Sequence, residues 1–145
     1  MMRSVFFTVL SLALAGGVPA SANEPSAPFK VIVNSRVPGR VIPRDVLAQL
    51  YLGSVGRWGN ARLIAPVDLS STSAVRAAFS VQVLGMPVEA VKLHWLRRLS
   101  AGQRPPLSKP SDEDVIAFVA AEPGGIGYVS HPTPLPATVR ELALQ

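Results

Sequence analysis

The residues Pro123-Gly124-Gly125-Ile126-Gly127-Tyr128-Val129 mark a change from helix to strand. Before them, Ser111 and the acidic turn 112–114 form a typical helix start, because a hydroxyl caps free amides and negative charge favours a helix N-terminus. Val115, Phe118 and Val119 would face inward from this helix. Pro and Gly then end it, and the apolar run 126–129 predicts a short strand. We expect this helix to pack on the sheet that contains the strand.

The same alternation of strands and helices occurs earlier in the chain. Residues 29–34 predict a strand, with the continuous apolar run of a strand that is covered on both faces. Pro43 occupies the first turn of a predicted helix, and Gly53 ends it. A second strand is expected at 62–67.

Two further helices follow, and then a proline-rich segment. Helical spacing predicts a helix that ends at Gly85 and another that starts at Pro87, followed by a loop at 101–110. Residues 131–145 are predicted to be a proline-rich C-terminal tail with a last turn at 139–144. The resulting order, β-α-β-α-α-α-β, predicts an α/β fold with helices packed on a sheet.

The N-terminus has the features of a secretory signal. Arg3 is followed by an apolar run at 5–15, and Ala20-Ser21-Ala22 is a small-residue cleavage site. We expect cleavage after Ala22, a flexible tether at 23–28 and a periplasmic mature protein. Because the apolar run is too short to cross the hydrocarbon core and is broken by glycine and proline, we expect no stable membrane span after cleavage.

Composition excludes several kinds of site. The net charge is +5, but the basic residues are scattered and form no basic stripe, so we expect no nucleic-acid partner. The absence of cysteine excludes thiol chemistry and cysteine metal sites. His94 and His131 lie far apart with no carboxylate at metal spacing, so we expect neither a metal nor another cofactor, and no enzyme activity.

Several short motifs stand together in the order found in one family of receptors. They are Ile42-Pro43, Tyr51-Leu52-Gly53, Trp58-Gly59-Asn60, Arg76-Ala77-Ala78-Phe79, Trp95, Gly102, Pro105-Pro106, Ser111-Asp112 and the stretch 123–129. In this order the chain resembles the substrate-binding protein of the phosphate ABC transporter, within the type 2 periplasmic-binding-protein superfamily. The resemblance covers about residues 29–130.

This resemblance implies a single periplasmic-binding-protein-like lobe, with a small, mostly parallel sheet and helices packed on it. A full receptor of the family has two lobes, and the part that corresponds to the first lobe is missing here. The family carries an Arg-x-x-Ser-Gly-Thr-type loop before a helix, where this chain has Asp68-Leu69-Ser70-Ser71-Thr72. An aspartate therefore replaces an expected cation, and a serine replaces the glycine.

The best candidate for a ligand site is the start of the helix after the second strand. Free amides and hydroxyls at Ser70, Ser71, Thr72 and Ser73 could bind a small oxyanion such as phosphate, and Arg76 lies one turn further on. Asn34 and Ser35 would line the same edge if the two strands are parallel neighbours. Alternatively, the hydroxyls are ordinary caps and Arg76 pairs with Asp68. Asp68 would repel an anion unless Arg76 or a protonated ligand compensates.

Two functions fit these observations. The first is a solute-binding-like domain that binds phosphate or a similar oxyanion weakly, in phosphate uptake or sensing. The alternative is an interaction module that has kept the fold and lost the ligand, and docks onto an envelope or transporter protein. Trp58, in a glycine-rich loop, marks the candidate surface for such a partner.

Overall fold

The computed structural model describes residues 27–145 of the chain. The predicted signal sequence and most of the tether at 23–28 lie outside the described residues. The helices are α1 (Arg44–Tyr51), α2 (Ala74–Phe79), which continues into the π-helical turn η1 (Ser80–Leu84), α3 (Val88–Leu99) and α4 (Asp112–Ala121). The strands are β1 (Phe29–Asn34), β2 (Val41–Ile42), β3 (Ala65–Leu69), β4 (Leu107–Lys109), β5 (Gly125–Ser130) and β6 (Val139–Leu144).

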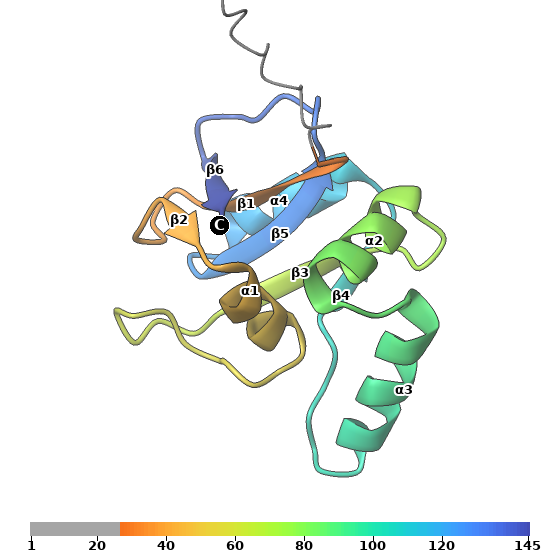
Figure 1. Ribbon diagram of the computed structural model, residues 1–145. Helices are drawn as coiled ribbons and strands as arrows, with labels where there is room; N and C mark the ends of the chain where they lie inside the picture. The colour runs from red at the N-terminus through yellow and green to blue at the C-terminus, as the bar shows by residue number, and fades with distance from the viewer. Residues whose placement is uncertain (1–26) are drawn as a thin grey trace, which may run out of the picture.

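The six strands form one mixed sheet in the order β2-β6-β1-β5-β3-β4 (Figure 1). Three of the five pairings are parallel, namely β2 with β6, β3 with β4, and β3 with β5. The strand β1 runs antiparallel to both of its neighbours, β5 and β6. The predicted α/β architecture with a mostly parallel sheet is therefore confirmed, although β1 reverses the direction within it.

The prediction of a last turn at 139–144 was wrong, because these residues form β6. Val31 of β1 lies opposite Leu142, and Ile42 of β2 lies opposite Leu144, so β6 occupies an inner position in the sheet. A six-residue segment after a run of prolines carries little periodicity of its own, and its hydrogen-bond partners come from the other end of the chain. The short strand β4 was likewise expected to be loop.

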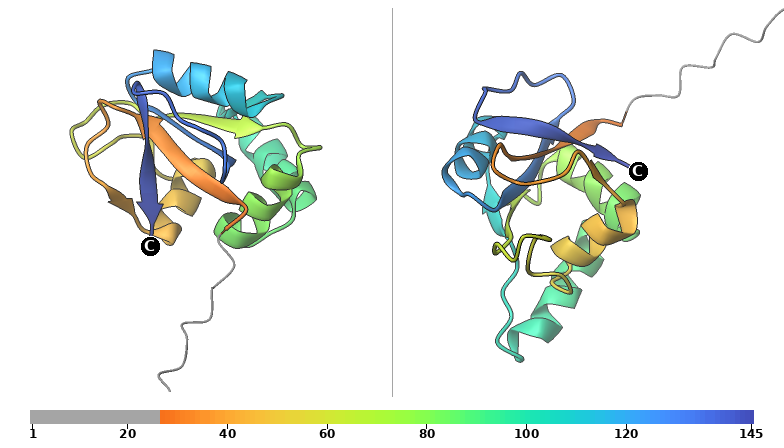
Figure 2. Two further views of the ribbon diagram at one scale, coloured as in Figure 1. Left: turned by 90° about the horizontal axis from the view of Figure 1, so that it is seen from above. Right: turned by 90° about the vertical axis from the view of Figure 1, so that its left-hand side faces the viewer.

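Helices cover both faces of the sheet (Figure 2). The helix α4 packs on one face, and α1 and α2 pack on the other. Neighbouring residues of β5 contact helices on the two different faces of the sheet, since successive strand residues point to opposite faces. A Cβ atom on Gly127 would lie only 2.7 Å from Val115 Cγ1 of α4, whereas Tyr128 packs against Phe79 of α2.

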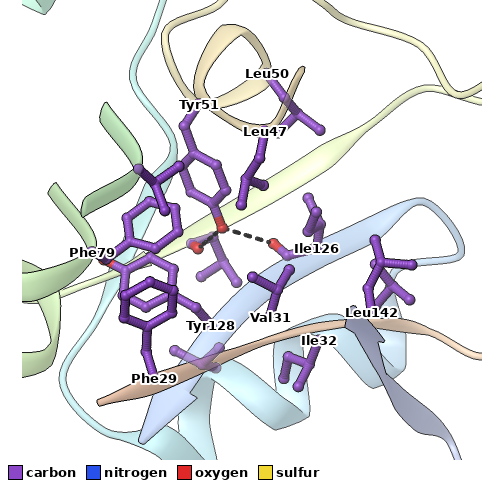
Figure 3. Packing of buried hydrophobic residues seen from close by; sticks show 14 of the residues in the cluster. Phe29, Val31, Ile32, Leu47, Leu50, Tyr51, Phe79, Ile126, Tyr128 and Leu142 are labelled. Carbon is purple, nitrogen blue, oxygen red and sulfur yellow. Dashed lines mark hydrogen bonds between the residues drawn. The ribbon is translucent and has the colours of Figure 1, made fainter. Parts of the chain in front are cut away.

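Four aromatic rings fill the space between the sheet and α1 and α2 (Figure 3). The ring of Phe79 stacks on that of Tyr128, with 3.8 Å between their centroids, and Phe29 and Tyr51 meet both rings edge to face. The hydroxyl of Tyr51 donates to the carbonyl oxygen of Val67 at 2.8 Å. This cluster fixes α2 relative to β3 and β5, and thereby positions the side chains at the C-terminal end of β3.

The helix α3 extends away from the sheet (Figure 1). Val91 and Trp95 are its buried residues, and both belong to the hydrophobic core. Within residues 27–145, no single helix has the length and apolar composition to cross a membrane; Ala74–Leu84 and Val88–Leu99 reach that criterion only when taken together across a 71° bend.

Candidate functional site

A groove of about 470 Å³ opens between α3 and the segment that leads into β4. Its polar end is formed by Asp68 at the end of β3, by Ser70 and Ser71 in the turn that follows, and by Arg76 of α2. Its apolar wall comes from α3 and from the prolines that precede β4; the residues are Val91, Trp95, Leu96, Leu99, Pro105 and Pro106. A groove of this size and apolar character, with a few convergent polar groups, is typical of small-molecule sites.

A buried network closes the polar end. The Arg76 Nη1 atom lies 2.7 Å from Asp68 Oδ2 and also donates to the Leu69 carbonyl at 2.9 Å. The other carboxylate oxygen of Asp68 accepts from the Tyr128 hydroxyl and from the Leu69 amide. Asp68 and Arg76 are only 5% and 8% exposed, so their charges face each other away from water. The pairing of Arg76 with Asp68, the alternative to a free anion-binding arginine, is what the structure shows.

Burial sets the protonation of this network. Burial raises the pKa of the Asp68 carboxyl, and the Arg76 guanidinium and the Tyr128 hydrogen bond oppose that rise. Burial and the adjacent Asp68 charge raise the pKa of Tyr128, and burial likewise raises the pKa of Tyr51 well above its usual value. Both phenols therefore remain hydrogen-bond donors. The net charge of the Asp68–Arg76 pair is zero when the aspartate is ionised.

One donor of this network has no partner. The Nε atom of Arg76 is buried and makes no hydrogen bond within the described residues. An unsatisfied buried donor costs about 1–3 kcal/mol, and more when it is charged. Arg76 is also one of the residues that line the polar end of the groove.

The turn before α2 uses some of its donors and leaves others free. The Ser73 hydroxyl caps α2 by accepting from the Arg76 amide at 3.2 Å, and the Thr72 and Ser70 hydroxyls are 3.0 Å apart. The Ser73 amide donates to the Ser70 carbonyl. Among the described residues, the amides of Ser71 and Ala74 donate to no protein group. The turn is thus partly an ordinary cap and partly available to a ligand.

Asn34 and Ser35 do not lie at this edge of the sheet. Because β1 is antiparallel to β5 and β5 is parallel to β3, the C-terminal ends of β1 and β3 lie at opposite ends of the sheet. The Asn34 amide nitrogen instead donates to the Val119 carbonyl at 2.9 Å, at the end of α4. The prediction that Asn34 and Ser35 line the same edge as the turn before α2 was therefore wrong, because β1 and β3 are not parallel neighbours.

Trp58 is tied to the body of the domain through its indole. The indole N–H donates to the carbonyl oxygen of Gly124 at 3.0 Å, and the side chain packs at the margin of the core.

Of the predicted site residues, the structure places Ser70, Ser71 and Arg76 together in the groove. Thr72 and Ser73 support the turn beside it.

Two parts of the site were not predicted as such. Residues 126–129 were expected to form a strand, but no local signal indicated that the Tyr128 hydroxyl donates to Asp68 from within the core. The helix that starts at Pro87 was predicted, but the apolar wall that it contributes to the groove was not. The signal for this wall in the sequence was the pair Leu96 and Leu99. These exposed leucines extend the apolar face of α3 beyond the buried Val91 and Trp95. Within residues 27–145, no cluster of histidine and carboxylate side chains is arranged to hold a metal ion.

The fold is similar to that of known phosphate receptors. An ABC-type phosphate transport receptor from Vibrio cholerae matches with a TM-score of 0.63 and 17% identity, over 81% of this chain and 46% of the receptor. PstS from Borrelia burgdorferi matches with a TM-score of 0.62 and 14% identity, over 81% and 47% of the two chains. A protein from Clostridium perfringens, solved with bound phosphate, gives a TM-score of 0.64 at 16% identity, over 81% and 44%.

The similarity extends over part of each receptor. The chain spans about half the length of the receptors it matches, in agreement with the single-lobe fold predicted from the sequence. No family model matches the chain, and no curated protein is similar to it in sequence. At this level of identity the comparison establishes the periplasmic-binding-protein-like fold.

Proposed function

We propose that this chain is an exported, solute-binding-like domain that binds a small oxyanion weakly at the polar end of the groove. The observation that carries the proposal is that Arg76 lines the groove together with Ser70 and Ser71, while its buried Nε has no hydrogen-bond partner among the described residues. An oxyanion would supply acceptors for this donor and for the free amides of the turn. Phosphate is the first ligand to test, since the structures with this fold include phosphate receptors.

Weak binding follows from the electrostatics of the site. Asp68 already neutralises Arg76, so little net positive charge remains to attract a second anion. The groove is also open to water, where each charged contact is worth much less than in a closed site. A singly charged, protonated phosphate should therefore bind better than the doubly charged form. Binding should be stronger in slightly acidic than in slightly alkaline buffer.

Isothermal titration calorimetry with phosphate and sulfate tests the proposal. The decisive variant is Arg76→Lys, which keeps a positive charge beside Asp68 but removes Nε and the planar edge that fits an oxyanion. We expect the heat of phosphate binding to fall at least tenfold in this variant. The matched control is Arg97→Lys, on the exposed face of α3. No heat at millimolar phosphate and sulfate, or unchanged binding by Arg76→Lys, would contradict the proposal.

Export and a role in phosphate uptake or sensing belong to the same proposal. The signal-like sequence at 1–22 and the fold shared with ABC-transport receptors support it. The test is N-terminal sequencing of the protein recovered from the periplasmic fraction. We expect it to begin at Asn23. A protein retained in the cytoplasm with residues 1–22 intact would contradict export.

A second candidate function is a periplasmic interaction module that has kept the fold and lost the ligand. The observation that favours it is the set of large apolar side chains that remain exposed, among them Leu63, Leu93 and Leu107. The envelope or transporter partner would dock on the face around Trp58. Pull-down from periplasmic extract is compared for the unmodified protein, Trp58→Phe and Trp58→Ala. Trp58→Phe changes the face but keeps an aromatic ring for packing, whereas Trp58→Ala removes both. Equal partner recovery from both variants and the unmodified protein would exclude the Trp58 face.

A further inference from the structure

The α3 wall of the groove is apolar and largely uncovered. Leu96 and Leu99 line the groove although they are 61% and 48% exposed, and they adjoin the buried Val91 and Trp95. Val91 and Leu99 are eight residues apart on one helix, which corresponds to about 12 Å of continuous apolar wall. A small inorganic ion would contact none of this surface.

The polar residues that line the groove come mainly from the end of β3, the turn that follows it and α2. Ser71 contributes an amide and a hydroxyl there, and Arg76 contributes its Nε; among residues 27–145, neither the Ser71 amide nor this Nε has a partner. Lys92 adds a positive charge at the α3 side of the groove, with Glu89 3.4 Å away at the surface. The groove thus joins a donor-rich polar end, where Arg76 is paired with Asp68, to an apolar wall.

We propose that the groove binds a monoanionic amphiphile, with a carboxylate head at Ser71 and Arg76 and a hydrocarbon body along Leu96 and Leu99. The proposal rests on the same groove as the proposed function, but it assigns a different class of ligand. The guanidinium edge that carries Nε has the planar geometry to receive a carboxylate. Because Asp68 cancels the charge of Arg76, a singly charged head is favoured over a multiply charged one.

The volume and chemistry of the groove favour a small molecule over a protein segment. About 470 Å³ lies within the range of roughly 300–1,000 Å³ that is typical of small-ligand sites. Arg76, one of the donors at the polar end, is nine-tenths buried. A single carboxylate would reach it more readily than a protein segment bound at the surface would. The apolar wall would supply the affinity and the polar end the orientation.

The tryptophan in the wall provides a direct probe. In a Trp58→Phe background, Trp95 is the remaining tryptophan, and its fluorescence reports occupancy of the groove. Hexanoate, octanoate and decanoate are titrated below their micelle-forming concentrations. We expect affinity to rise about two- to fourfold for each added methylene, as the chain buries more apolar surface. Octanol, which lacks the carboxylate, should bind more weakly than octanoate.

Two leucines on the same helix give a matched pair of variants. Leu96→Ser changes the groove wall, whereas Leu93→Ser changes a similarly exposed leucine that does not line the groove. We expect Leu96→Ser to weaken decanoate binding about tenfold and Leu93→Ser to leave it unchanged. Phosphate binding, measured by calorimetry in parallel, should be unaffected by either variant, so the ligand class is tested separately from the oxyanion proposal.

Several results would overturn the inference. Affinity that does not depend on chain length would exclude the apolar wall as a binding surface. Equal losses in Leu96→Ser and Leu93→Ser would indicate non-specific adsorption to α3. Binding to phosphatidylglycerol vesicles without binding to monomeric decanoate would assign α3 to a membrane surface instead. Phosphate binding without decanoate binding would leave the proposed function intact and remove this ligand class.

Discussion

The two buried tyrosines allow a sharp test of the charged network. The Tyr128 hydroxyl donates to the Asp68 carboxylate, whereas the Tyr51 hydroxyl donates to the neutral carbonyl of Val67. A hydrogen bond to a charged group contributes about 1.5–3 kcal/mol, and one between neutral groups about 0.5–1.5 kcal/mol. Tyr128→Phe should therefore destabilise the domain about twice as much as Tyr51→Phe. Both substitutions keep the aromatic ring and its packing.

Thermal unfolding followed by circular dichroism measures the difference. At roughly 4 °C per kcal/mol for a domain of this size, we expect the Tm to fall by about 6–12 °C in Tyr128→Phe and by about 2–6 °C in Tyr51→Phe. The excess loss should disappear at acidic pH, once Asp68 is protonated. A double variant with Asp68→Asn should show a loss smaller than the sum of the two single losses. Equal losses for the two tyrosines at neutral pH would refute the charged hydrogen bond.

Three further predictions follow from the same packing. Burial raises the pKa of Asp68 in the folded chain above its usual value of 3.8. Between 3.8 and this raised pKa the folded state binds more protons than the unfolded state, so the free energy of unfolding should fall as the pH rises through that range. Urea unfolding of Asp68→Asn should lack this fall. Gly127→Ala should cost about 1–3 kcal/mol because its Cβ would meet Val115 at 2.7 Å, whereas Gly59→Ala, with open space around it, should change the unfolding free energy little. Leu142→Ala should lower the unfolding free energy by about 2–5 kcal/mol, as expected for a core strand; a loss no larger than that of an exposed leucine would contradict the inner position of β6.

Local signals were sufficient to predict most helices. Pro43 and Ser111 stand immediately before α1 and α4, and the Ser111 hydroxyl accepts from the Asp114 amide as a cap should. Gly85 ends η1 with a positive φ of 69°, a conformation that glycine adopts without a steric cost. These features act within a few residues of one another, so the sequence carries them directly.

The strands were harder to predict because their partners are distant. The second strand runs over 65–69 rather than 62–67, and therefore includes Asp68 and Leu69. This shift places Asp68 beside Tyr128 in the core instead of in a polar loop. The contacts that decide the register connect β3 with β5 and β4, which follow much later in the chain.

By itself the sequence determined the approximate positions of most helices, the alternation of apolar runs, and a turn rich in hydroxyls and amides before Arg76. Only the tertiary structure decided that β1 runs antiparallel to its neighbours, that 139–144 complete the sheet, and that Asp68 neutralises Arg76. The reason is physical: caps and helical periodicity depend on interactions between nearby residues, whereas strand pairing and buried ion pairs depend on groups brought together from distant parts of the chain.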